Sequence, residues 1–459
     1  MESDYRIERD SLGDVRIPGD ALWGPQTQRA VDNFDFSGYP MPDSLRRSLG
    51  LLKAAAAHAN AELSKLDTKT AAAIIAVGLR IWEGDLSEAF PVEVFQTGSG
   101  TSWNMNMNEV VAGLASRETG DRVHPNDHVN MGQSSNDVIP AAINIACLAD
   151  LDALTAAAGL LKTAVQQKAV EFHGIIKLGR THLQDAVPVR LGDGFSAVAA
   201  QLQQSIEALS GTVDILSRVP LGGTAVGTGL NTHPDFAAIA CRFISERVHH
   251  SVIPADIPSA EMSSRLPQVA LMGSLQLIAV TLQRWCIDLR LLSSGPYGGL
   301  GEISLPELQP GSSIMPGKIN PVIPEAVQQI AVHVIGKAAT VSAAAAQGPL
   351  ELNIMFPLVA FETLESVRLL GNACNGLRTR CVAGITAHPD VCRDQVERSL
   401  SLITKVAEEI GYDKAAKIAL RAQREGRSLR DILAHEEGYS TQECSKLLDP
   451  ESMLPPFAP

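Results

Sequence analysis

The sequence predicts a mainly α-helical protein built on a long central helical bundle, with smaller N- and C-terminal domains. Hydrophobic residues make up 45% of the 459 residues but aromatic residues only 4%, so aliphatic side chains and alanine must form the core. This composition favours packed helices over a β-sandwich, which depends on β-branched and aromatic residues. Apolar residues also recur at helical spacing along the middle of the chain.

The longest periodic stretch alternates steps of four and three residues over three heptads. Its members are Leu271, Leu275, Ile278, Leu282, Trp285, Leu289 and Leu292. Similar stripes run from Leu151 to Val165, from Val198 to Leu216 and from Val327 to Ala338. Helices of about 30 residues are roughly 45 Å long, and stripes of that length are difficult for one chain to cover. We therefore expect several copies to associate through the bundle; a monomeric bundle with its own core is the alternative.

Three domains are expected from the distribution of patterns. Residues 1–137 form a mixed N-terminal domain, residues 138–388 the central helical bundle, and residues 389–459 a small, more charged domain of short helices.

The charge and cysteine content exclude several classes of protein. The formal net charge of −13 argues against a nucleic-acid groove as the main surface. The seven cysteines are odd in number and lack Cys-x-x-Cys spacing, so neither a disulfide framework nor a zinc site is expected. No membrane span is expected, and the segment 1–6 lacks the features of a signal peptide. We expect a cytoplasmic protein with no metal and no cofactor.

Five segments rich in glycine and small polar residues separate the helical stretches, and such loops commonly carry chemistry on a rigid scaffold. They are residues 97–108, 124–137, 178–186, 222–234 and 311–321. The last is the most informative, because Ser312 and Lys318 lie between glycines whose neighbouring amides can form an anion-binding nest. It is not a phosphate loop, since five residues separate Gly311 from Gly317 and Ile319 follows the lysine.

The segment Gly311–Pro321 resembles the signature loop of the fumarase/aspartase superfamily, whose members mostly add or remove a small group across the double bond of fumarate. Further motifs in chain order are similar to class II fumarases. They are Leu22–Ala30, Thr97–Thr101, His124–Asp127, Gln133–Asp137, Gly179–Ala186 and Gly222–Asn231. Ile410–Ala416 also resembles the fumarase C-terminal domain. The ordered series covers nearly the whole chain.

The resemblance implies a homotetramer around a shared central bundle, with each active site assembled from loops of three subunits. It implies that a small dicarboxylate is the substrate, and that fumarate is hydrated through an intermediate whose charge collects on a carboxylate. Preorganised donors and cations would stabilise that charge.

The resemblance also assigns roles to residues. Ser312 would be the base that removes the carbon proton, its alkoxide stabilised by loop amides and Lys318; a hydroxyl that only bonds within the loop is the alternative. Lys318 and Asn320 would hold one carboxylate. His182, oriented by Glu325, would handle the water, since such a pair moves protons near neutral pH.

Neutral hydrogen bonds to the substrate would come from a further set of residues, whose alternative role is that of helix caps and turn residues. The set is Ser99, Thr101, Ser134, Ser135, Asn136 and Thr181. His124, Asn126 and Asp127 resemble a second anion site. The sequence departs from that pattern at Asp121, where fumarases have a basic residue.

Two other functions remain open. Pro321–Glu325 looks more like an aspartate ammonia-lyase than a fumarase. Trp103 replaces a small polar residue beside the substrate loop, which could reshape the pocket for a substituted fumarate. A catalytically inactive helical scaffold is a third possibility, against which the intact set of Ser312, Lys318 and His182 argues.

Overall fold

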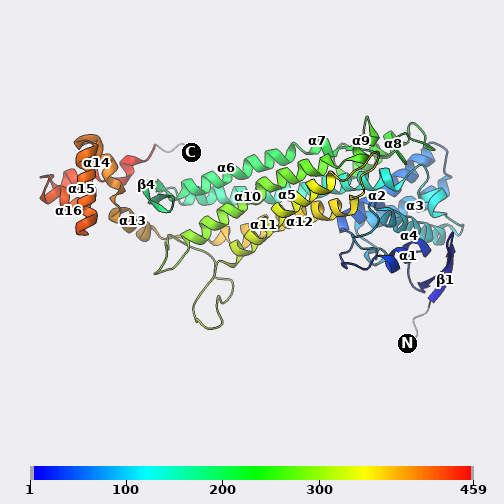
Figure 1. Ribbon diagram of the computed structural model, residues 1–459, viewed down its shortest axis with the longest axis horizontal. Helices are drawn as coiled ribbons and strands as arrows, with labels where there is room; N and C mark the ends of the chain where they lie inside the picture. The colour runs from blue at the N-terminus through cyan, green and yellow to red at the C-terminus, as the bar shows by residue number, and fades with distance from the viewer. Residues whose placement is uncertain (1–4, 456–459) are drawn as a thin grey trace. The chain divides into compact units, whose positions relative to one another are not determined.

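The structure, a computed structural model, describes residues 5–455 (Figure 1). The expectation of no signal peptide rests on the segment 1–6. Residues 1–4 of that segment lie outside the described residues. The chain divides into two compact units, each made of three stretches of sequence. The first unit is Met1–Ala157, Ser205–Val280 and Ile330–Asn372; the second is Ala158–Gln204, Thr281–Gln329 and Ala373–Pro459. Nothing in this division tests the expected boundaries at residues 137 and 388, which stay predictions.

Long helices carry the apolar stripes, so the expected mainly helical fold is confirmed. They are α5 (Ser135–Glu171), α6 (Leu191–Ser210), α10 (Leu266–Leu292), α11 (Val322–Ala345) and α12 (Phe356–Arg380). On α10, the heptad residues from Leu271 to Leu289 are buried, and Leu292 is half-buried in the last turn. Burying one stripe of a helix against its neighbours is the main source of helical stability in a protein.

One stripe does not form a single helix. The periodicity from Val198 to Leu216 predicted continuous helix, but α6 ends at Ser210 and a separate turn, α7 (Val213–Leu216), follows. The Thr212 hydroxyl donates to the carbonyl of Leu209 (2.7 Å), which satisfies a carbonyl at the end of α6. Leu216 is nevertheless buried, so the stripe survives the break.

The first unit begins with an antiparallel hairpin and continues through packed helices. Its other elements are β1 (Tyr5–Asp10), β2 (Gly13–Pro18), α1 (Pro25–Asn33), α2 (Asp43–Glu62), α3 (Thr68–Glu83), η1 (Ser87–Ala89), α4 (Thr101–Thr119), η2 (Pro125–Val129), β5 (Arg218–Val219), α8 (Phe236–Val248), β6 (Ile253–Pro254) and α9 (Pro258–Ser263). Helices α2 and α3 touch at two glycines. A Cβ on Gly78 would lie 2.6 Å from the carbonyl oxygen of Gly50, so only glycine allows this approach.

The second unit has an aromatic core where three long helices meet. Phe195 of α6 packs edge to face on Phe172, the residue after α5, with ring centroids 5.3 Å apart, and on Trp285 of α10, at 6.1 Å. These are favourable geometries for aromatic pairs. The unit also contains β3 (Ile176–Thr181), β4 (Gln184–Arg190), β7 (Ile303–Ser304), η3 (Val382–Gly384) and β8 (Thr386–Ala387).

Short helices form the C-terminal part of the second unit, as the sequence indicated. They are α13 (Pro389–Arg398), η4 (Leu400–Leu402), α14 (Ile403–Ile410), α15 (Tyr412–Glu425), α16 (Leu429–His435), α17 (Thr441–Leu447) and η5 (Pro450–Met453). Their buried side chains share one cluster with Leu178 of β3. The β3–β4 hairpin is therefore packed against the C-terminal helices.

Two helices, α5 and α10, have the length and apolar composition of a membrane span. Their most apolar windows are 72% and 56% buried inside the protein. Core helices of water-soluble bundles have the same properties, so this result is weak support for a membrane span.

The motif Leu22–Ala30 has a structural explanation. The buried carboxylate of Glu109 accepts hydrogen bonds from the backbone amides of Gly24, Gln26 and Thr27, and from the Thr27 hydroxyl at 2.6 Å. An acidic side chain therefore caps the N-terminus of α1 from another helix. The close approach leaves no room for a Cβ on Gly24, which would lie 2.8 Å from the carboxylate.

We expect Glu109→Ala to lower the free energy of unfolding by about 2–3 kcal/mol, because it leaves buried amides without an acceptor. Chemical denaturation of the two proteins measures this difference. Glu109→Gln, which keeps one oxygen, should lose less. Equal stability of Glu109→Ala and the parent protein would contradict this role.

Candidate active site

The segment 311–321 folds into a closed loop ahead of α11. The amide of Gly311 donates to the carbonyl of Lys318 (2.8 Å), and the side-chain amide of Asn320 donates to the carbonyl of Gly311 (2.7 Å). A Cβ on Gly311 would lie 2.6 Å from the Lys318 carbonyl oxygen, which explains that glycine. Asn320 is half-buried and Lys318 is exposed.

The Ser312 hydroxyl faces two backbone donors of this loop. Its Oγ accepts hydrogen bonds from the amides of Ile314 and Met315, each at 3.2 Å. Consecutive amides aimed at one oxygen are a preformed anion site. The same geometry would stabilise an alkoxide at Ser312.

A cavity of about 730 Å³ lies beside this loop in the second unit. Lys318, Asn320 and Glu325 line it, together with Arg290 and His388. Lys318 and Asn320 of this segment and Glu325 of α11, all predicted to serve the site, therefore border one space.

His182 lies at the exposed tip of the β3–β4 hairpin. Both His182 (φ 55°) and Leu183 (φ 58°) adopt left-handed backbone conformations, which make the tight turn between Thr181 and Gln184. Glu325 lies in the first turn of α11. Within the described residues of one chain, no hydrogen bond or ion pair joins the His182 ring to Glu325, so the predicted pair is not formed inside a single chain.

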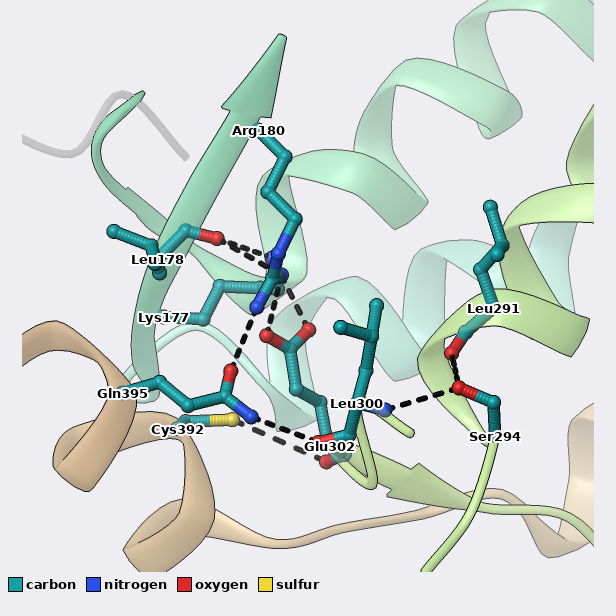
Figure 2. A network of polar contacts seen from close by, with 9 residues as sticks. All are labelled: Lys177, Leu178, Arg180, Leu291, Ser294, Leu300, Glu302, Cys392 and Gln395. Atoms are coloured by element: carbon teal, nitrogen blue, oxygen red, sulfur yellow. Dashed lines mark hydrogen bonds and ion pairs between the residues drawn. The ribbon is translucent and has the colours of Figure 1, made fainter. Parts of the chain in front are cut away.

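Two residues before His182, Arg180 forms an ion pair with Glu302 in a buried polar network (Figure 2). Sequence reasoning missed both residues, because an arginine in a polar loop and a glutamate after glycine look like ordinary surface charges. The segment Gly179–Ala186 was the only available signal.

Thr181 ends β3 in the second unit, and the first unit holds the other predicted substrate residues in two groups. The hydroxyls of Ser99 and Thr101 are 2.7 Å apart at the start of α4. Gly98 packs against the Ile354 carbonyl so tightly that a Cβ would lie 1.9 Å from its oxygen. The backbone at this motif therefore requires glycine.

The second group lies at the start of α5. The side-chain amide of Asn136 donates to the carbonyl of Ala225 (2.9 Å), and the Ser135 hydroxyl accepts from Asn104 (3.3 Å). The Ser134 hydroxyl accepts from the amide of Asn136 (3.2 Å), as a helix-capping serine does. These hydrogen bonds order the start of α5.

A buried charge supports this second group. Asp137 accepts from the amides of Ser134, Gly222 and Thr224 at 2.9–3.0 Å. It thereby joins the start of α5 to the segment 222–234. Burial raises the pKa of Asp137 to about 6 despite these donors.

Lys53 is a fully buried lysine on α2 that the sequence analysis did not select. Its ammonium donates to the side-chain oxygens of Asn130 (3.0 Å) and Gln133 (2.9 Å), directly before Ser134. Burial lowers the pKa of Lys53 to about 7. A single lysine inside an alanine-rich run was the available signal.

The residues of the expected second anion site form a local cap. Nδ1 of His124 accepts hydrogen bonds from the amides of Asn126 (3.2 Å) and Asp127 (3.0 Å). Asp121, at the position where fumarases have a basic residue, is paired with Lys69. This geometry gives the group a structural role and leaves anion binding untested.

Trp103 corrects one expectation. Its ring is fully buried, and its indole nitrogen donates to the carbonyl of Val92 (3.0 Å). A tryptophan with a satisfied N–H is an ordinary core residue. The suggestion that Trp103 reshapes a substrate pocket is therefore wrong.

We expect Lys53 to make stability depend on pH. The unfolded chain keeps this lysine protonated up to its ordinary pKa of 10.5, whereas the folded chain releases the proton near pH 7. Between pH 7 and 8 the unfolded state therefore binds more protons, and rising pH favours folding by up to about 1.4 kcal/mol. Chemical denaturation should show this gain in the parent relative to Lys53→Met. Identical pH slopes for the two proteins would contradict it.

Known proteins resemble the chain over nearly its whole length. A family model described as Lyase matches residues 13–336, and one described as Fumarase C C-terminus matches residues 402–455. The class II fumarate hydratase of Halobacterium salinarum is 47% identical over 463 residues, covering 99% of this chain and 98% of that protein. The class II fumarate hydratase of Xylella fastidiosa (strain 9a5c) is 45% identical over 450 residues, covering 98% and 95%.

The fold agrees with a solved structure of the same class. The crystal structure of recombinant class II fumarase from Schistosoma mansoni is 34% identical, with a TM-score of 0.94 and coverage of 98% of this chain and 99% of that one. Sequence and fold therefore agree over the helical scaffold, the loops between the helices and the C-terminal helices: the chain belongs to the class II fumarase family of lyases.

Proposed function

We propose that this protein catalyses the reversible hydration of fumarate to malate. Its relatives at 45–47% identity over nearly the full length are named class II fumarate hydratases. The observation that supports the chemistry best is the Ser312 hydroxyl facing the amides of Ile314 and Met315.

In the dehydration direction, Ser312 as an alkoxide removes a proton from the carbon next to a carboxylate of malate. The electron pair moves into that carboxylate, giving an aci-form that carries the extra negative charge. Hydroxide then leaves the neighbouring carbon and takes a proton, so fumarate and water are released. Hydration follows the same steps in reverse.

The difficult step is the first, because a serine hydroxyl is a weak acid. Two amide donors at 3.2 Å favour the charged oxygen over the neutral one. Lys318 adds a positive charge from the same loop and would bind one substrate carboxylate together with Asn320. Because one N–H of the Asn320 side chain holds the loop closed, its other N–H is the donor that would bind the substrate carboxylate.

The neutral donors of the first unit would bind the carboxylates and the water. They are Ser99, Thr101, Ser134, Ser135 and Asn136, with Thr181 added from the second unit. His182 would accept and return the proton of the water, with Glu325 orienting its ring. Nδ1 of His124 already accepts from the amides of Asn126 and Asp127. These three residues would therefore form the second anion site through their other polar groups.

A homotetramer with composite sites would bring His182 and Glu325 together. No hydrogen bond or ion pair joins them within the described residues of one chain. A pair would therefore need His182 from one subunit and Glu325 from another. Helix α10 also exposes apolar side chains opposite its buried stripe: Leu277, Val280, Ile287 and Leu291 are 37–52% exposed. Such a face is typical of a helix that packs against another copy of the chain.

We place the reaction in the cytoplasm. We assign it no cofactor, because every proposed step uses side chains of this chain. Aspartate ammonia-lyase is the second candidate, favoured by Pro321–Glu325. The relatives named fumarate hydratase favour the first. A hydratase of a substituted fumarate has lost its main argument, since Trp103 is a core residue.

We expect Ser312→Ala to lower kcat by about 10²–10⁴-fold, because it removes the base. Loss of fumarate absorbance without ammonia measures the reaction. Ser313→Ala is the matched control, since it removes a neighbouring exposed hydroxyl and should keep parental kcat. Unchanged activity of Ser312→Ala would remove Ser312 from the mechanism, and turnover only with ammonia would contradict the hydratase.

We expect subunit mixing to restore activity to pairs of inactive variants. His182→Asn and Ser312→Ala chains, each inactive alone, should form mixed tetramers in which about a quarter of the sites combine both intact residues. Co-expression followed by the fumarate assay measures the recovery. No recovery in mixed tetramers would show that both residues act within one subunit.

A further inference from the structure

Glu302 is a fully buried carboxylate in the second unit, directly before β7 (Figure 2). Its Oε1 accepts a hydrogen bond from the Arg180 guanidinium at 2.6 Å, and its Oε2 lies 3.1 Å from the Lys177 ammonium. Both cations belong to β3. These two ion pairs therefore hold the strand that leads to His182.

The backbone of Glu302 joins two further segments. Its amide donates to the carbonyl of Leu292 at the end of α10, and its carbonyl accepts from the amide of His388, each at 2.9 Å. Glu302 thus connects β3, the end of α10 and the start of α13.

Gln395 of α13 completes the network. Its side-chain oxygen accepts from Arg180 at 2.7 Å, and its side-chain amide donates to the carbonyl of Leu300 at 2.8 Å. Figure 2 shows Gln395 and Glu302 on the same guanidinium, which also donates to the carbonyl of Leu178 (3.3 Å). Because the Arg180 guanidinium is planar, its hydrogen bonds to three acceptors fix its orientation.

The second strand of the hairpin is held as well. Asp185 of β4 accepts a hydrogen bond from the Ser399 hydroxyl at 3.1 Å. On the first strand, β3, Leu178 is buried among the C-terminal helices. The turn at His182 and Leu183 is exposed. The hairpin is therefore fixed at its base, and the position of His182 depends on that base.

Stability alone does not explain these charges. Buried Lys177 and half-buried Arg180 share one buried carboxylate, and replacing such a group by apolar side chains commonly keeps or raises stability. Charged hydrogen bonds have strict geometry, which apolar contacts lack. The network therefore gives the hairpin a defined position that a purely apolar contact would not.

We propose that Glu302 is a positioning residue for the hydration reaction: through Arg180 it holds the hairpin so that His182 reaches the water in the active site. This inference rests on the proposed role of His182. It predicts an effect on kcat and little effect on fumarate binding, since among the described residues of the second unit no hydrogen bond or ion pair joins Glu302 to Lys318 or Asn320.

The test compares full-length variants as assembled enzymes. Glu302→Gln should lower kcat by about 10–100-fold, the usual effect of a residue that orients a catalytic group, with KM for fumarate within about threefold of the parent. Arg180→Lys keeps the charge without the planar fork and should also lower kcat. Glu109→Gln is the matched control, since it alters a buried carboxylate of the first unit and should lower Tm while kcat stays parental.

A combined variant separates positioning from stability. Lys177→Met, Arg180→Met and Glu302→Leu together replace the charged group by apolar side chains, so we expect Tm near the parental value with kcat still reduced. Recovery of kcat together with Tm would overturn the proposal, as would parental kcat in Glu302→Gln. His182→Asn with parental kcat would refute both this proposal and the role of His182, whereas a parent enzyme without hydratase activity would refute the proposed function itself.

Discussion

The buried apolar stripe of the long helices is the constraint on which the rest of the structure depends. Along α10, residues Leu271 to Leu289 turn one face inward, and helices of this kind are stable only when that face is covered. The polar segments that end or precede these helices have no such requirement. They are therefore free to carry glycines, hydroxyls and charges, and the candidate catalytic groups lie there.

Buried carboxylates then hold the loops on this scaffold. Glu109 fixes the start of α1, Asp137 joins the start of α5 to the segment beginning at Gly222, and Glu302 fixes the hairpin that carries His182. Glu109 and Asp137 accept several hydrogen bonds, and Glu302 forms two ion pairs, with partners that are mostly distant in sequence. A charge that is buried in this way leaves few alternative arrangements, because any shift would leave it unpaired.

Local chemistry made part of the site predictable. The spacing of Gly311, Ser312 and Lys318 indicated an anion-binding loop, and the structure places the amides of Ile314 and Met315 on the Ser312 hydroxyl. Lys53 and Glu302 could not be found in this way, because their partners are far along the chain. Trp103 was misjudged for the same reason: its neighbours in sequence are polar, but its ring is in the core.

The sequence by itself determined the helical class, the periodic stripes and the family, because these depend on residue spacing and on ordered motifs. Tertiary structure alone decided that the Val198–Leu216 stripe breaks after Ser210, that Lys53, Glu109, Asp137 and Glu302 are buried, and which groups they bond. Periodicity reports only which face of an element is apolar. Whether a charge is buried, and what it bonds, depends on segments that meet only after folding.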